Sequence, residues 1–144
     1  MSLVNEDDLE WRTVERGETA FRRKQLGAAA GGNRLGCSLY EIPPGKKSWP
    51  YHYHAANEEA IHVLAGSGAI RLDDEMHDLE AGTHVALPTG DAGGHRVIND
   101  SDELLRYLVV STMEEPDVTV YPDSEKFGVY VGSPPGEQDG RTLE

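Results

Sequence analysis

Short strand-forming runs, separated by turn residues at regular intervals, constrain the fold of this chain more than any other feature of its sequence. From Arg34 onward, runs rich in Val, Ile, Leu, Tyr and Thr alternate with clusters of Gly, Pro, Asn and Asp. This spacing predicts many short strands in an all-β sandwich or barrel. No stretch of helical length shows the 3.6-residue apolar period, so an α/β fold is not expected. The predicted strands are residues 34–42, 48–54, 58–65, 68–73, 76–79, 83–87, 94–99, 103–111 and 117–121.

The length of 144 residues is close to the commonest size of a single domain. Residues 1–33 are mixed and polar and end in a segment rich in Gly and Ala, which predicts an N-terminal extension without a regular pattern. We expect the barrel to occupy residues 34–121. A C-terminal extension with a loose tail rich in Pro and Gly would then occupy residues 122–144.

Charge and cysteine content limit the partners of the chain. The 26 acidic and 13 basic residues give a formal net charge of −13, which repels nucleic-acid backbones. No run approaches the ~20 apolar residues of a membrane span, and the first residues do not resemble a signal peptide. The single cysteine, Cys37, permits no internal disulfide and points to a reducing compartment. We therefore expect a cytoplasmic protein with no nucleic-acid or membrane partner.

Three histidines and one glutamate form a candidate metal site. Side chains alternate faces along a strand, so His52 and His54 point the same way. A turn at residues 55–57 can bring Glu59 back beside them, and His95 lies on a later strand. Converging imidazoles and one carboxylate suit a single divalent transition metal ion, such as Zn, Fe, Mn, Ni, Co or Cu. Four protein ligands also permit a closed structural zinc site.

These residues resemble the two motifs of the cupin family. The first motif is a glycine, a short spacer, His-x-His, three or four residues, Glu, six residues and Gly. Here it is formed by Gly45, His52, His54, Glu59 and Gly66. In the second motif, a glycine is followed by Pro-x-Gly, a histidine and an asparagine. Here it is formed by Gly82, Pro88, Gly90, His95 and Asn99. The glycine six residues further on selects Glu59 as the motif glutamate rather than Glu58. Two loops are longer than usual, and Thr83 stands where an aspartate often follows the motif's first glycine.

The resemblance covers about residues 34–111 and implies a double-stranded β-helix, or jelly-roll, barrel. It implies that one divalent metal ion is bound by His52, His54, Glu59 and His95. It also implies a small-molecule ligand and a homodimer. Residues 1–33 and 121–129 are the candidate dimer contacts.

Several side chains are candidates to line the cavity around the metal, on the basis of strand parity or proximity to the histidines. They are Trp49, Ile61, Val63, Val85, Val97 and Tyr107. For each one, the alternative is simple packing in the barrel core. Tyr107 is also the candidate catalytic residue, because a phenol can act as a general acid or hydrogen-bond a ligand. His62 and His84 have the opposite parity and are expected to lie outside the cavity.

Three kinds of function stay open at this point. The chain could be a metalloenzyme acting on a small molecule, a non-catalytic binding module or a protein with a closed structural zinc. The interior positions named above are mostly apolar and include no cluster of Arg or Lys. We therefore expect a neutral or aromatic ligand that chelates the metal. Among enzymes, this slightly favours dioxygenase-type chemistry over a sugar isomerase or epimerase.

Overall fold

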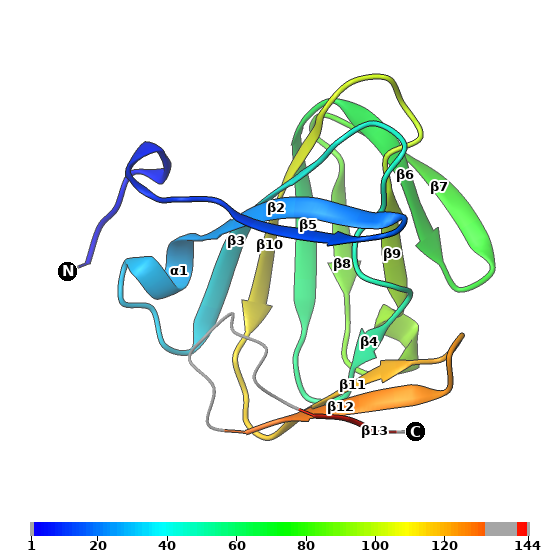
Figure 1. Cartoon of the computed structure of the whole chain (residues 1–144). Coiled ribbons are helices and arrows are strands. Elements are labelled where there is room, and N and C mark those ends of the chain that lie inside the picture. The colour runs from blue at the N-terminus through cyan, green and yellow to red at the C-terminus, as the bar shows by residue number, and fades with distance from the viewer. Residues whose placement is uncertain (1, 132–140, 144) are drawn as a thin grey trace.

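The computed structural model describes residues 2–131 and 141–143, and it consists almost entirely of short antiparallel strands (Figure 1). Two 3-10 turns, η1 (Glu6–Asp8) and η2 (Asp91–Gly93), and one short helix, α1 (Leu26–Ala29), interrupt them. The strands are β1 (Arg12–Arg16), β2 (Thr19–Gln25), β3 (Leu35–Ile42), β4 (Tyr53–His54), β5 (Glu59–Ala65), β6 (Ser67–Leu72), β7 (Glu75–Glu80), β8 (His84–Leu87), β9 (His95–Ile98), β10 (Leu105–Thr112), β11 (Asp117–Tyr121), β12 (Lys126–Tyr130) and β13 (Arg141–Leu143).

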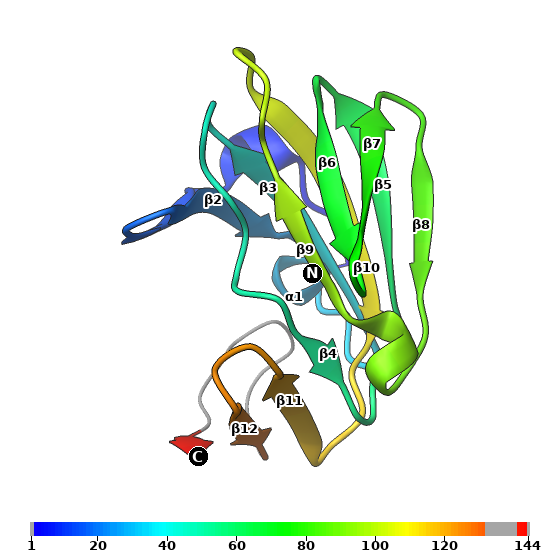
Figure 2. The ribbon, with the colours of Figure 1, turned by 90° about the vertical axis from the view of Figure 1, so that its right-hand side faces the viewer.

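The strands form three sheets. The largest has the order β1-β2-β3-β10-β5-β8, the second β7-β6-β9 and the third β13-β12-β11-β4. β10 pairs with β3 on one side and β5 on the other, which places Tyr107 opposite both Tyr40 and Val63. In the turned view, the first two sheets lie side by side, with β4, β11 and β12 below them (Figure 2). The predicted all-β fold is confirmed.

The core lies between the six-stranded sheet and the three-stranded sheet β7-β6-β9. In β5, Ile61 and Val63 are each only 1% exposed, whereas His62 between them is exposed, as the period of two along a strand requires. Burying each aliphatic side chain of this size contributes roughly 1.5–3 kcal/mol. The core is formed by Phe21, Tyr40, Ile42, Ile61, Val63, Ile70, Leu79, Leu87, Val97, Leu105 and Tyr107.

Two structured regions differ from the expectation drawn from the sequence. The segment 1–33, expected to have no regular pattern, contains β1, β2 and α1. β2 forms because it pairs with β3 and buries Phe21, which is a tertiary effect that its polar composition does not reveal. Residues 126–130 form β12 by pairing with β11, although no strand was predicted in this C-terminal extension. The expected loose tail falls largely on residues 132–140 and 144, which lie outside the described residues.

The predicted strand 48–54 is also shorter in the structure. Only Tyr53–His54 form β4, and His52 makes an isolated bridge to His95. Pro50 has no N–H to donate to a ladder, which accounts for the interruption before the histidines.

Gly66 joins β5 to β6 and explains one glycine of the first motif. Its φ of 83° lies in the left-handed region, where a residue with a side chain is strained. A Cβ at this position would also collide with the carbonyl oxygen of Leu104. The turn therefore requires glycine for two independent reasons. In the described part of the chain, no helix has both the length and the apolar character needed to cross a membrane.

Candidate metal centre

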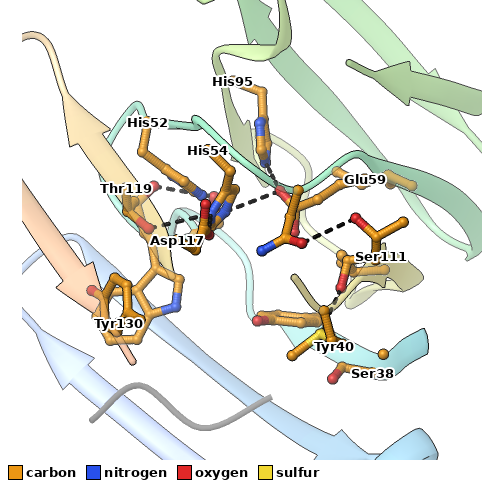
Figure 3. A pocket seen from close by; sticks show the side chains of 18 of the residues that line it. Ser38, Tyr40, His52, His54, Glu59, His95, Ser111, Asp117, Thr119 and Tyr130 are labelled. Carbon is orange, nitrogen blue, oxygen red and sulfur yellow. Dashed lines mark hydrogen bonds and ion pairs between the residues drawn. The ribbon is translucent and has the colours of Figure 1, made fainter. Parts of the chain in front are cut away.

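The four predicted ligands come from three places in the fold and lie close to one another. His52 and His54 lie in and just before β4, while Glu59 begins β5 and His95 begins β9. Reciprocal backbone hydrogen bonds join His52 to His95, with N···O distances of 3.2 and 3.0 Å. The three imidazoles point towards the Glu59 carboxylate (Figure 3). The barrel therefore brings together residues that are separated by more than forty positions in the chain.

The distances within the cluster suit one small cation. Ligand atoms of His52, His54 and Glu59 all lie within 4.8 Å of one another. Glu59 Oε1 is 3.2 Å from His54 Nε2 and 3.9 Å from His95 Nε2. The rings of His52 and His95 are adjacent, with centroids 4.7 Å apart. The structure thus places His95 beside the other three predicted ligands.

Backbone carbonyl groups orient two of the imidazoles. His52 Nδ1 lies 2.8 Å from the carbonyl oxygen of Pro50, and His95 Nδ1 lies 2.9 Å from that of Gly93. A carbonyl oxygen can only accept, so each Nδ1 donates its proton and each Nε2 keeps a free lone pair. Metal-binding histidines are commonly held by a hydrogen bond of this kind. The donor set fits a divalent transition metal ion.

Asp117 orients the third imidazole, and the sequence analysis missed this residue. Its Oδ2 accepts from His54 Nδ1 at 2.8 Å, and its Oδ1 accepts from the Ala56 backbone N–H at 3.0 Å. Thr119 Oγ1 lies 3.2 Å from the same Nδ1. Asp117 and Thr119 lie two positions apart in the predicted strand 117–121, so strand parity indicates that they share a face. The pairing of β11 with β4, which aims that face at His54, is not readable from the sequence.

Burial and charge determine where a proton sits when the cluster has no metal bound. Burial lowers the pKa of His52 to about 3 and also lowers that of His95, so both rings stay neutral. Burial acts in the same direction on His54, but hydrogen bonds to Asp117 and Glu59 outweigh it and raise its pKa to about 10. Burial raises the pKa of Glu59, but the His54 hydrogen bond and the charges of the three imidazoles together outweigh burial and lower it to about 2. A metal ion that binds His54 Nε2 must therefore displace a proton.

The cluster forms part of the wall of a cavity of about 540 Å³. Of the predicted pocket residues, Trp49, Ile61, Val97 and Tyr107 line this cavity. Val63 and Val85 are not among its lining residues. Val63 lies two residues beyond Ile61 on the same face of β5 and is buried in the core. Val85 packs against that core.

The rest of the cavity wall is more polar than the sequence suggested. The polar lining residues that sequence reasoning missed include Arg23 of β2, Ser38 and Tyr40 of β3, Ser111 of β10 and Tyr130 of β12. In the close view, Ser38, Tyr40 and Ser111 lie across the cavity from His52 (Figure 3). A cationic side chain therefore lines a cavity that was expected to be mostly apolar. Arg23 gave no signal because it belongs to the strand that was not predicted.

A sequence model of the cupin domain matches residues 38–111, just over half of the chain. This chain is a cupin. The match agrees with the two motifs and with the jelly-roll arrangement of the sheets. A comparison with curated proteins finds no match.

Solved structures resemble the cupin over almost its full length. One is a protein from Acidithiobacillus ferrooxidans described provisionally as a sugar phosphate isomerase. It has 28% identity and a TM-score of 0.84, and the match covers 98% of this chain and 90% of that chain. Another is a cupin-superfamily sugar phosphate isomerase from Silicibacter pomeroyi, with 26% identity, a TM-score of 0.85 and coverage of 97% and 90%. The polyketide cyclase RemF from Streptomyces resistomycificus has 25% identity, a TM-score of 0.68 and coverage of 81% and 83%. These similarities confirm the predicted jelly-roll cupin barrel.

Tyr107, the candidate catalytic residue of this cupin, lies in the cavity wall and is 1% exposed. Its ring stacks on that of Tyr40, with centroids 5.4 Å apart. Burial raises its pKa well above the ordinary value, so the phenol stays protonated at neutral pH. It can donate a hydrogen bond to a ligand but cannot act as a base.

Two further histidines lie outside the cavity, on the opposite face of the sheet. His62 and His84 are exposed and face each other across β5 and β8, with their Nδ1 atoms 3.2 Å apart. Asn99, the asparagine of the second motif, is fully buried. Its amide nitrogen donates to the carbonyl oxygens of Ile42 and Glu103, both at 2.7 Å. Asn99 therefore holds the β9–β10 turn against β3.

Proposed function

We propose that this cupin is a divalent-metal-dependent enzyme that isomerises a phosphorylated sugar. The observation that carries the proposal is a cluster of three histidines and one glutamate in the wall of a cavity that also contains Arg23. Such a cavity can hold a ligand with oxygen atoms at one end and an anionic group at the other. Two proteins described as sugar phosphate isomerases match nearly the whole chain at 26% and 28% identity, which supports the same conclusion.

Within this proposal, His52, His54, Glu59 and His95 hold the metal. A divalent ion bound there would supply a Lewis acid that polarises a carbonyl oxygen and an adjacent hydroxyl group. The hydroxyl groups of Ser38 and Ser111 face the same cavity and can hydrogen-bond sugar hydroxyls.

Tyr107 remains the candidate general acid. Its protonated phenol can donate to the oxygen of the substrate carbonyl, where negative charge develops during isomerisation. The stacking on Tyr40 fixes the ring, so that little freedom is lost when a ligand binds. Removing the hydroxyl with Tyr107→Phe should lower kcat more than it raises KM.

The test is isomerisation and solvent exchange by metal-loaded protein. Pentose and hexose phosphates incubated with the protein in D₂O should interconvert between aldose and ketose, with deuterium entering at the carbon next to the carbonyl. The same experiment with His95→Ala should show no conversion, whereas Lys46→Gln, an exposed residue outside the cavity, should behave like the original protein. Failure of every sugar phosphate to convert or exchange would reject the proposal.

Dioxygenase-type chemistry stays a prediction with weaker support. It was preferred because the expected cavity residues included no Arg or Lys, and Arg23 removes that reason. Oxygen uptake with Fe(II), tested on catechols, thiols and dicarbonyl compounds, would measure it. Uptake that depends on His52 and His54, together with no isomerisation, would favour the oxygenase. Metal binding without turnover in either assay would instead favour a non-catalytic binding module.

We also propose a homodimer in the cytoplasm. The outer face of the largest sheet exposes Leu64 and Val110, by 42% and 41%, and such side chains favour a contact with a second copy. Light scattering coupled to size-exclusion chromatography would measure the mass. A monomer at micromolar concentration would contradict this assembly.

A further inference from the structure

We infer that Arg23 and Trp49 form a subsite for the phosphate group of the ligand. In the part of the chain that the structure describes, two buried side-chain nitrogen atoms have no hydrogen-bond partner, and these are Arg23 Nε and Trp49 Nε1. Both residues line the cavity that contains the metal ligands. Buried donors in folded proteins nearly always have a partner, so two such donors in one cavity wall indicate that their acceptor comes from a ligand.

The surrounding aromatic residues hold both donors in place. Arg23 lies opposite Tyr40 in the β2–β3 ladder, and its Nη1 donates to the Tyr40 hydroxyl at 3.2 Å. The Phe21 ring packs against both Tyr40 and Trp49, with centroid distances of 5.2 and 5.1 Å. Arg23 and Trp49 are thus anchored to the same aromatic group. Their wall of the cavity is formed by β2, β3 and the segment before β4.

The chemistry of the two donors defines the group they can bind. The guanidinium is permanently charged and only donates, and the indole nitrogen also only donates. A matching ligand group must carry several acceptor oxygens and a negative charge, and planar arginine suits phosphate oxygens well. The choice of phosphate over carboxylate rests on the proposed function. The phosphate would lie at this wall, while the sugar oxygens would reach the cluster of His52, His54, Glu59 and His95.

The position of Arg23 also accounts for ligand orientation. Arg23 belongs to β2, whereas the candidate metal ligands come from β4 and the residue before it, from β5 and from β9. A ligand held at both places is fixed at its two ends, which aligns the reacting carbons beside Tyr107. A ligand without the phosphate would keep only its contacts with the metal and the hydroxyl groups of the wall.

Calorimetric titration of the metal-loaded, full-length protein with inorganic phosphate tests the subsite directly. We expect Arg23→Gln to weaken phosphate binding about 10- to 100-fold, and Arg23→Lys to weaken it less because the charge remains. Trp49→Phe, which keeps an aromatic ring of smaller size and removes the N–H, should weaken it about 3- to 10-fold. Lys46→Gln removes an exposed positive charge outside the cavity and should leave the affinity unchanged. Metal content and thermal midpoint are measured for each variant, so that a folding defect is recognised.

Several results would overturn the inference. They are an absence of phosphate binding, equal affinity in Arg23→Gln at full metal content, and acetate binding that matches phosphate and depends equally on Arg23. If Arg23→Gln does not fold, Arg23→Lys and Trp49→Phe carry the test, and unchanged affinity in both would overturn it. Loss of phosphate affinity on Arg23→Gln would support the subsite even if no sugar phosphate is isomerised. A failure of the proposed reaction is therefore distinguishable from a failure of the subsite.

Discussion

The proton on His54 makes a sharp prediction about stability and pH. In the metal-free protein, Asp117 and Glu59 raise the pKa of His54 from 6.5 to about 10, against the opposing effect of burial. A group whose pKa is raised by folding stabilises the folded state fully below its unfolded pKa, and this contribution is lost as pH rises through the folded pKa. The metal-free protein should therefore become less stable between pH 6.5 and 10.

The size of the effect follows from the shift. Between the two pKa values, the folded state holds one proton more than the unfolded state. Each rise of one pH unit therefore shifts the folding equilibrium constant tenfold towards the unfolded state. The full shift corresponds to an upper limit of about 5 kcal/mol, since one pKa unit is about 1.4 kcal/mol. The opposite shift of Glu59 describes the same ion pair and is not counted a second time.

Urea unfolding at a series of pH values between 6.5 and 9.5, in the presence of a chelator, measures this dependence. The control is His54→Gln, which removes the titrating group, so the difference in slope between the two proteins isolates His54. The metal-loaded protein should lose the slope as well, because His54 has already given up its proton to bind the ion. Equal slopes for the metal-free protein, the metal-loaded protein and His54→Gln would refute the reasoning.

Three further predictions test the candidate metal ligands, the role of Asp117 and the turn at Gly66. The double variant His52→Ala with His54→Ala should retain no first-row metal by elemental analysis, and full metal content would overturn the ligand assignment. Asp117→Asn should weaken metal binding about 10- to 100-fold at pH 9 in a chelator competition. The asparagine amide has one acceptor oxygen, so it cannot replace both carboxylate oxygens that accept from His54 and from the Ala56 N–H. Unchanged affinity for the metal would show that Asp117 does not orient His54. Gly66→Ala should lower the unfolding free energy by at least about 2 kcal/mol more than Gly82→Ala. Both glycines have positive φ, but only a Cβ at Gly66 meets backbone, so equal losses would contradict the collision.

The candidate metal ligands could be identified from the sequence because their signals are local. His52 and His54 share a face by simple alternation along the chain, and the spacing to Gly66 selects Glu59. Gly66 itself is required by its φ and by the nearby Leu104 carbonyl group, so the motif reflects a steric need. Strand spacing predicted an all-β sandwich or barrel, and the resemblance to the cupin motifs implied the jelly roll. These features depend on residues close in sequence or on a repeated pattern.

Arg23 and Asp117 were missed because their roles depend on pairing between distant segments. β2 has the sequence TAFRRKQ, with little apolar alternation, and its stability comes from pairing with β3. The ion pair between Arg22 and the buried Glu41, at 2.6 Å, adds to that pairing. Asp117 reaches His54 only because β11 pairs with β4. Neither contact leaves a periodic signal in the sequence.

The location of the missed residues bears on how this cupin acquires its specificity. The matched cupin domain, residues 38–111, contains all four candidate metal ligands and Tyr107. Arg23 precedes that region, whereas Asp117 and Tyr130 follow it, yet all three line the cavity. The barrel thus supplies the candidate metal centre and the hydroxyl groups of Ser38, Tyr40 and Ser111, and the flanking strands add Arg23, Asp117 and Tyr130 to the cavity wall. We expect a chain with the same motifs but different flanking strands to keep the metal-binding residues and to bind a different ligand. We therefore expect β2, β11 and β12 to determine which ligand this cupin binds.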